Sequence, residues 1–390
     1  MESRALLAEV VREVLADVHG TALTAAALRK DAARSTLRVG TRSIDLQAHR
    51  RVVLLGAGKA SGAMAVACEE VLGDRLSRGL VVTGEDGRYP LRYTDVAFGS
   101  HPVPGEDSLR AGEALLACAA ALGPDDLCIF LLSGGASALC EALRPGVSLE
   151  ALQAKTRALL ASGAPIDAIN HVRRSLSRLK AGGLAEVSRA RIVTLALSDV
   201  ASNDPRVIGS GPTVKDEAGD DYFVVADAET LAASATRRLA ARGLTVVRGP
   251  RLEGEASHVG AALSVSCDAG TAQVRVGETT VTLGDEPGRG GRNQELALAF
   301  ALGAAGRSDL ALAAIGTDGR DGPTDAAGAI VDGTTLSRRS GGASLVRGGP
   351  DAATALACHD AYPYLDRAGD LVRTGPTGTN LADLVICIRR

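Results

Sequence analysis

Two glycine-rich segments, more than half the chain apart, each carry a cation beside the predicted start of a helix. The first, GAGKASG, follows the apolar run RVVLL and contains Gly56, Gly58 and Lys59. The second, GRGGRNQE, precedes the apolar run LALAFAL and ends its glycine stretch at Arg292. Unpaired N–H groups at helix N-termini attract anions, and the helix dipole favours the same charge. The two segments therefore predict a phosphorylated ligand and an acidic co-substrate, held between two lobes.

The first segment matches neither of two familiar phosphate-binding patterns. GAGKASG lacks the upstream glycine of GxxxxGK[ST], and Ser61 stands where GxGxxG requires its third glycine. A dinucleotide site is therefore weakly supported. Two interpretations of Lys59 stay open: it stabilises charge on a transferring phosphoryl group, or it is a solvated lysine at an ordinary strand–helix turn.

A third segment, LLSGGASAL, repeats the arrangement of a buried strand followed by small residues and a helix. It contains Ser133, Gly134, Gly135 and Ser137. Hydroxyl groups and exposed backbone N–H groups suit phosphate or carboxylate binding. The GxSxG pattern of a nucleophilic serine is absent. We expect an anion site here, with a purely structural turn as the alternative.

Carboxylates and an amide follow two further predicted strands. Asp199, Asn203 and Asp204 lie in SDVASNDPR, and Asp318 and Asp321 lie in GTDGRDGPTD. Oxygen ligands at strand ends are placed to hold Mg²⁺ or to accept a proton. The spacing does not match the calcium-binding EF-hand loop. Capping of helices and turns is the competing interpretation.

Composition limits the classes of function. A chain of 390 residues favours two domains. A net charge of −3 and an aromatic content of 2% argue against nucleic-acid partners. The N-terminus does not resemble a signal peptide, and no apolar run reaches the length of a membrane span. We expect a cytoplasmic protein without a membrane partner, whose seven cysteines are mostly reduced and buried.

The pattern of apolar runs predicts an α/β protein. Continuous apolar strands alternating with helices indicate a parallel sheet covered on both faces. The strands expected in the first part are residues 52–56, 79–84, 127–132 and 191–198. After about residue 225 the pattern changes, and residues 271–284 look like a hairpin. Further strands are expected at residues 310–316 and 382–388, which predicts a second lobe with some antiparallel pairing.

Eight motifs occur in the order in which they occur in the glycerate 2-kinases of the MOFRL type, which the chain resembles over roughly residues 5–388. They are GAGKASGAM, GSHPVPGEDS, LLSGGASALCE, NHVRRSLSRLKAGGLA, SDVASNDPRVIGSGPT, GRGGRNQELAL, TDGRDGPTDAAGAIVDG and TGPTGTNLADL. The resemblance implies ATP-dependent phosphorylation of D-glycerate to 2-phosphoglycerate with Mg²⁺ or another divalent cation. The family's key lysine falls on Lys59, and its key arginine falls on Arg292.

The same resemblance implies two α/β domains, a larger one with a mostly parallel, Rossmann-like sheet and a smaller mixed lobe, with the active site in the interdomain cleft. We expect residues 1–230 to form the glycerate kinase domain and residues 231–390 the MOFRL-type domain, with the option that the last strand returns to the larger domain. The expected partners are D-glycerate and ATP, and the expected assembly is a monomer or a homodimer.

The predicted site has three groups of residues. The catalytic pair is Lys59 and Arg292. The residues expected to bind ATP or substrate are Gly56, Gly58, Ser133, Gly134, Gly135, Ser137, Asn203, Gly290, Gly291, Asn293, Gln294 and Glu295. The expected metal ligands are Asp199, Asp204, Asp318 and Asp321. Family members often have VxGDD after the SD pair, so the amide of Asn203 weakens the case for a metal role at that position.

The alternative activity is an NAD(P)-dependent hydroxypyruvate reductase, since some relatives have that name. Such an enzyme needs a sound GxGxxG and an acidic residue about twenty residues later to bind the ribose. Glu85 and Asp86 are the acids nearest to that position, somewhat late in the sequence.

Overall fold

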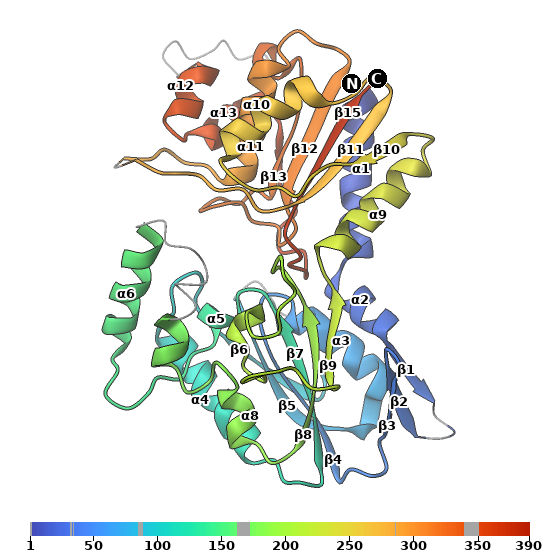
Figure 1. Ribbon diagram of the computed structural model, residues 1–390, viewed down its shortest axis with the longest axis vertical. Helices are drawn as coiled ribbons and strands as arrows, with labels where there is room; N and C mark the ends of the chain where they lie inside the picture. The colour runs from blue at the N-terminus through green and yellow to red at the C-terminus, as the bar shows by residue number, and fades with distance from the viewer. Residues whose placement is uncertain are drawn as a thin grey trace. The chain divides into compact units, whose positions relative to one another are not determined.

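The computed structural model describes all residues except 1, 32, 34, 85–88, 162–171, 285 and 339–350. The chain forms two compact units, whose helices and strands are labelled in Figure 1. Unit 1 consists of Met1–Val18, Ala228–Thr377 and Ala382–Arg390. Unit 2 consists of His19–Asp227 and Gly378–Leu381.

Unit 2 is built on a six-stranded sheet in which every neighbouring pair is parallel. Its strand order is β6-β5-β4-β7-β8-β9. The strands are β4 (Arg51–Ala57), β5 (Leu76–Thr83), β6 (Thr94–Phe98), β7 (Asp126–Ser133), β8 (Arg191–Leu197) and β9 (Tyr222–Ala226). The predicted parallel sheet is confirmed, and its four expected strands are β5, β4, β7 and β8.

Helices cover both faces of this sheet. Helix α3 (Ser61–Leu72) packs on one face, whereas α4 (Glu106–Ala120) and α8 (Gly183–Val187) pack on the other, over alternate residues such as Val53 and Leu55. Other helical elements of unit 2 include α2 (Gly20–Ala27), α5 (Ala136–Leu139), α6 (Leu149–Ala161), η1 (Gly73–Arg75) and η2 (Ile208–Ser210). A small antiparallel sheet of β1 (Leu28–Asp31), β2 (Thr36–Val39) and β3 (Arg42–Asp45) was not expected from the sequence.

Unit 1 contains a mixed six-stranded sheet, as predicted. Its order is β10-β11-β15-β12-β13-β14, and β10 with β11 is the parallel pair. The strands are β10 (Thr245–Arg248), β11 (Thr271–Gly277), β12 (Leu310–Gly316), β13 (Gly328–Asp332), β14 (Leu371–Val372) and β15 (Asp383–Arg389). Helices α1 (Glu2–Asp17) and α9 (Ala228–Ala240) cover one face. The other face carries α10 (Ala256–Ser266), α11 (Arg292–Gly303), α12 (Ala352–Ala357) and α13 (Ala361–Ala368), and η3 (Thr335–Ser337) follows β13.

Three expectations about this part of the chain are corrected. The hairpin at 271–284 is wrong, because both edges of β11 are already paired, with β10 and β15. The last strand does not return to the larger unit, since β15 lies between β11 and β12 inside unit 1. The first helix, placed by the predicted boundaries in the domain 1–230, packs instead on unit 1.

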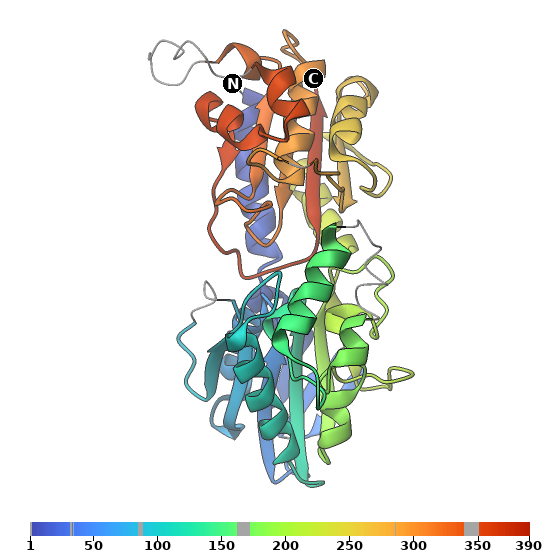
Figure 2. The ribbon, with the colours of Figure 1, turned by 90° about the vertical axis from the view of Figure 1, so that its left-hand side faces the viewer.

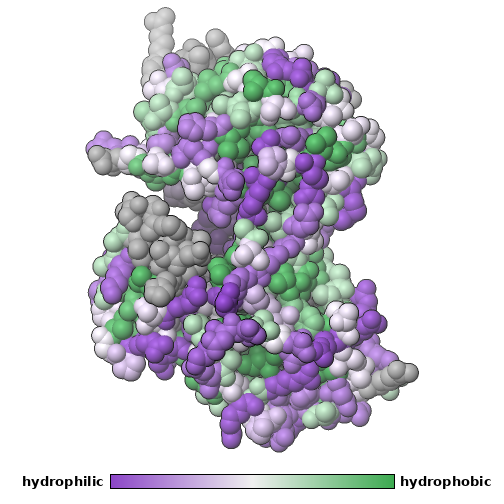
Figure 3. All heavy atoms as spheres, in the orientation of Figure 1, coloured by the Kyte–Doolittle hydropathy of each residue, from purple (hydrophilic) through white to green (hydrophobic). Residues whose placement is uncertain are grey.

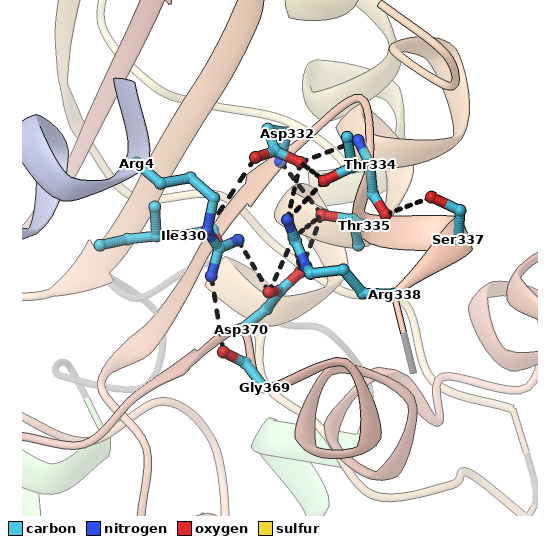
Figure 4. Close-up of polar contacts among 9 residues, drawn as sticks. All are labelled: Arg4, Ile330, Asp332, Thr334, Thr335, Ser337, Arg338, Gly369 and Asp370. Carbon is cyan, nitrogen blue, oxygen red and sulfur yellow. Dashed lines mark hydrogen bonds and ion pairs between the residues drawn. The ribbon is translucent and has the colours of Figure 1, made fainter. Parts of the chain in front are cut away.

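Helix α1 is fixed to unit 1 by an apolar face and by a buried ion cluster. The buried face includes Leu7, Val10 and Val14, and the helix runs beside β12 and β13 (Figures 1 and 2). At its start, Arg4 lies 2.7 Å from Asp370, whose carboxylate is fully buried (Figure 4). Arg338 binds the same carboxylate at 2.7 Å. The cluster thus joins the first turn of the chain to the end of the sheet.

The face drawn in Figure 3 carries hydrophilic and hydrophobic residues that are interspersed over both units. Large apolar side chains that are exposed, such as Val265 and Leu283, come from different segments of the chain. None of the helices in the described residues is both long and apolar enough to span a bilayer.

Candidate active site

The loop that carries Lys59 is tied to the end of the neighbouring strand. The Lys59 N–H donates to the carbonyl of Gly134 at 2.9 Å, and the Ala60 N–H donates to Ser133 Oγ at 2.9 Å. Gly58 has a φ of 129°, and a Cβ there would lie 2.3 Å from Ser133 Oγ. The loop therefore needs glycine at this position both for its backbone conformation and for the close approach of β7.

The start of α3 is partly occupied by groups of the protein itself, and its role as an anion site stays a prediction. The Ser61 N–H donates to the carbonyl of Gly58 at 3.1 Å. The ring of Tyr89 lies against Gly62, where a Cβ would come within 2.1 Å of it. Gly56 lies inside β4, close to the carbonyl of Leu131, so its role is strand packing. The backbone N–H groups of Lys59, Ala60 and Ser61 are thus engaged within the protein, and the side chain of Lys59 is the cation that we expect to act on an anion here.

Lys59 and His101 lie side by side against Gly135. A Cβ on Gly135 would be 3.1 Å from Lys59 Cγ and 3.4 Å from His101 Cδ2. Gly135 has a φ of 84° and begins the short helix α5. Ser137 in that helix accepts a hydrogen bond from Ser210 at 3.0 Å. The glycine pair after β7 thus leaves room for a cationic side chain above the strand ends.

Asp199 joins this group from the end of β8. Its Oδ2 accepts a hydrogen bond from Asn380 Nδ2 at 2.9 Å. A Cβ on Gly134 would lie 1.9 Å from Asp199 Oδ2 and 2.0 Å from Asn380 Nδ2, so this glycine is required for the contact. The structure therefore brings the ends of β4, β7 and β8 together, as predicted for parallel strands.

Asn203 and Asp204 have local partners. The Asn203 Nδ2 donates to Asp227 at 2.6 Å, beyond the end of β9. Arg206 donates to Asp204 through its Nε at 3.0 Å and its Nη2 at 2.6 Å. These hydrogen bonds hold the pKa of Asp204 below its usual value. Both side chains therefore shape the 199–206 loop.

Arg292 in unit 1 is bound by carboxylates of its own unit. Its Nε and Nη2 donate to the two oxygens of Asp383 at 2.6 and 3.0 Å, and its Nη1 contacts Glu278. Burial alone would lower the pKa of Arg292, but Asp383 and Glu278 raise it above its ordinary value. Arg292 is thus a fixed, permanently charged group at the first residue of α11.

The N-terminus of α11 is occupied by Asp321. Its Oδ1 accepts the N–H of Asn293 at 3.0 Å, and its Oδ2 accepts the N–H of Gln294 at 2.8 Å. Burial raises the pKa of Asp321 to about 7, and the two N–H donors oppose that rise. A Cβ on Gly291 would lie 2.3 Å from the Asp321 carboxyl carbon, so glycine is needed there. The protein's own carboxylate fills the place predicted for a ligand anion.

The rest of the glycine loop is anchored within unit 1. Glu295 is buried and lies 2.9 Å from Nδ1 of His359. Burial raises the pKa of Glu295, and the contact with His359 opposes that rise. A Cβ on Gly290 would lie 3.3 Å from the His359 carbonyl. Glu295 and Gly290 therefore fix the loop that precedes and begins α11.

The four predicted metal ligands fall two in each unit, Asp199 and Asp204 in unit 2 and Asp318 and Asp321 in unit 1. Asp318 accepts the N–H of Arg320 at 3.1 Å. Within the described part of the chain, no three His, Cys, Asp or Glu side chains group so as to hold a metal ion. A metal site thus stays a prediction, and in the described part of the chain fewer than three such side chains would bind the ion.

Comparison with known proteins covers both parts of the chain. A model described as "Domain of unknown function (DUF4147)" matches residues 6–242, and the MOFRL family model matches residues 271–383. The "D-glycerate 2-kinase" of Thermotoga maritima is 36% identical over 382 residues, covering 86% of this chain and 90% of that protein. The chain belongs to the MOFRL-type glycerate 2-kinase family.

Solved structures and other relatives agree with this family. The crystal structure of the Thermotoga maritima glycerate kinase superposes with a TM-score of 0.81 and 32% identity, covering both chains completely. A "putative hydroxypyruvate reductase" of Agrobacterium vitis is 37% identical over 383 residues, covering 86% of this chain and 98% of that protein. The glycerate 2-kinase fold is therefore shared along the whole length of this chain.

Sequence reasoning missed several side chains that contact the predicted site residues, among them Asp383, Glu278 and Asn380. Both Asn380 and Asp383 belong to the motif TGPTGTNLADL, in which Asn380 precedes the buried strand β15 and Asp383 is its first residue. Polar residues directly before an apolar run were the available signal. Glu85 and Asp86, the acids weighed for a dinucleotide ribose, lie outside the described residues.

Proposed function

We propose that this protein transfers the γ-phosphoryl group of ATP to the 2-hydroxyl of D-glycerate, giving 2-phosphoglycerate and ADP. The observation that carries the proposal is the position of Lys59, held against Gly135 at the joined ends of β4 and β7. The relatives named as glycerate kinases match over nearly the full chain, which supports the same substrate here.

Phosphoryl transfer depends on positioning and charge neutralisation more than on covalent chemistry by the protein. Since several N–H groups at or just before the start of α3 and α11 already have partners, we assign that charge to side chains. Lys59 neutralises charge that develops on the phosphoryl group or on the acceptor oxygen. Arg292 binds the glycerate carboxylate, because a planar guanidinium matches a carboxylate in two-point contact.

Asp199 in unit 2 and Asp318 in unit 1 are separate candidates for a carboxylate that would bind Mg²⁺. Mg²⁺ prefers oxygen ligands and needs only one or two carboxylates besides substrate phosphates, so sparse ligands fit it. When bound, the ion neutralises phosphate charge. Asp321 binds the start of α11 and Asp204 binds Arg206, so we do not assign these two to the metal.

A direct assay tests the proposal. Purified protein with Mg-ATP and D-glycerate should produce ADP in a coupled assay, and NMR of the product should show phosphate on the 2-hydroxyl. The Lys59→Ala variant, purified in the same way, controls for a contaminating kinase. Phosphate on the 3-hydroxyl would overturn the assignment of the acceptor, and no ADP would overturn the kinase.

The reductase alternative has support in the name of the Agrobacterium vitis relative. The geometry at α3 opposes it. A dinucleotide pyrophosphate needs backbone N–H groups at the start of the helix. Here the N–H groups of Lys59 and Ala60, just before α3, donate to Gly134 and Ser133, and Tyr89 lies against Gly62. Hydroxypyruvate with NADH or NADPH should therefore give no cofactor oxidation. Activity in that assay alone would reverse our assignment.

A further inference from the structure

Arg292 uses only part of its hydrogen-bonding capacity within the protein. A guanidinium group carries five N–H donors in one plane. Asp383 takes the Nε and one N–H of Nη2, and Glu278 contacts Nη1. One N–H on each terminal nitrogen is therefore not engaged by these two carboxylates. Those two N–H groups can bind an outside anion only if the side chain is held in place.

The two carboxylates differ in burial. The side chain of Asp383 is 2% exposed, whereas that of Glu278 is 54% exposed and that of Arg292 is 35% exposed. A buried two-point ion pair resists separation, because removing either partner strands a charge in a poorly solvated place. An exposed contact is weak and exchanges easily. Asp383 is thus the partner that can hold Arg292 in one orientation.

The sheet gives Asp383 a fixed position. It is the first residue of β15, and its cross-strand neighbours are Gly277 on β11 and Gly316 on β12. Because both cross-strand neighbours are glycines, neither of them places a side chain beside the carboxylate. A Cβ on Gly316 would already lie 3.5 Å from Asp383 Oδ1. The register of β15 between β11 and β12 therefore fixes the position of Asp383. Through its ion pair, Asp383 in turn fixes the orientation of the Arg292 guanidinium.

We propose that Asp383 is the positioning residue of Arg292: it holds one edge of the guanidinium so that the terminal N–H groups meet the carboxylate of the substrate. This inference rests on the proposed function. Asp383 does not itself touch the substrate. Its carboxylate orients the cation and prevents the exposed side chain from adopting other rotamers.

The first test compares two buried aspartates of unit 1 that bind arginine. Asp383→Asn should raise KM for D-glycerate and lower kcat/KM by about tenfold or more, with a small effect on KM for ATP. Asp370→Asn, in the Arg4 and Arg338 cluster, is the matched control and should lower stability without changing either KM. An unchanged kcat/KM in Asp383→Asn would overturn the proposal.

The second test does not need Asp383→Asn alone to fold well. Added guanidinium chloride at millimolar concentration should partly restore activity to Arg292→Ala, because Asp383 can hold the free cation. The double variant Arg292→Ala/Asp383→Asn should show no restoration. Lys59→Ala, which keeps the Asp383 site filled by Arg292, should not respond. Equal restoration with and without Asp383 would overturn the proposal.

A binding measurement separates this inference from the kinase assignment. Millimolar guanidinium should raise the Tm of Arg292→Ala relative to the double variant, in the absence of glycerate and ATP. If that shift appears but no variant or wild-type protein phosphorylates D-glycerate, the proposed function fails and the positioning role of Asp383 stands. If wild-type activity is present and the shift is absent, the positioning role fails.

Discussion

Lys59 is the side chain on which the proposed chemistry most depends. Its backbone is bound to Gly134, and its side chain lies beside Gly135. Lys59→Ala should lower kcat by about a hundredfold or more, the size of effect that follows loss of one charge-stabilising donor. Coupled measurement of ADP release gives kcat, and thermal unfolding should show that the variant remains folded.

A matched control is Lys215→Ala. Lys215 is 66% exposed and pairs with Glu186 on the surface of unit 2. Its removal should leave kcat unchanged, because exposed ion pairs contribute little. A similar loss of kcat in both variants would mean that Lys59 has no specific role.

The sequence predicted the positions of Lys59 and Arg292 but not their surroundings. A strand, a glycine pair and a lysine that begins a helix form a local pattern that can be recognised. Asp383 binds Arg292 across 91 residues, and nothing local marks such a pairing. Whether an anion can bind near the starts of α3 and α11 also depends on which protein groups already accept the N–H groups there. Two of these acceptors, Ser133 and Asp321, come from segments that are distant in the sequence.

At the scale of elements, the glycine after β7 controls how closely β7 and β8 can bring their polar ends together. Gly134→Ala would place a Cβ within 1.9 Å of Asp199 and 2.0 Å of Asn380. We expect loss of most activity, since atoms near the reacting groups must shift. Steady-state assays check this. Gly219→Ala, where no atom lies within 4 Å of the added carbon, is the control and should behave as wild type.

The start of β7 offers a prediction of pH dependence. Asp126 is fully buried and binds Arg51 through Nε at 3.0 Å and Nη2 at 2.5 Å, which holds its pKa well below the usual value. Because the pKa of Asp126 is lower in the folded protein than in the unfolded chain, its ionised carboxylate stabilises the fold at pH values above about 3.9, the pKa in the unfolded chain. This contribution is lost as the pH falls from there through the lower pKa of the folded state.

Asp126→Asn should therefore lower the free energy of unfolding by about 1–3 kcal/mol at pH 7, the range for hydrogen bonds to charged groups. The difference from wild type should shrink between pH 4 and pH 2. Urea unfolding at several pH values measures this. A constant difference at all pH values would show that the charge of Asp126 contributes nothing.

The central strands were predictable because they are buried on both faces and read as continuous apolar runs. The edge strands β6 and β9 are partly exposed, so their sequences carry less signal. The β13 segment, GAIVD, follows a glycine-rich stretch, and it is not among the strands expected from the sequence. Its neighbours β12 and β14 make it a strand, which is information that only the tertiary structure supplies.

At the scale of the whole molecule, α1 stabilises the unit formed by the other end of the chain. Deleting residues 2–17 would expose the apolar surface beneath Leu7, Val10 and Val14, and it would leave Asp370 without Arg4. Hydrogen exchange should become faster in β12 and β13, while β4 and β7 keep their protection. Equal acceleration in both units, or in neither, would contradict this division of the fold.

The chain passes from one unit to the other after Val18, Asp227, Thr377 and Leu381. Because β15 lies between β11 and β12, the sheet of unit 1 cannot be completed until Asp383–Arg389 has left the ribosome. Unit 2, by contrast, has its whole six-stranded sheet once Ala226 has been synthesised. Throughout translation, the first helix must keep its apolar face away from other nascent chains while its partner strands are still being made.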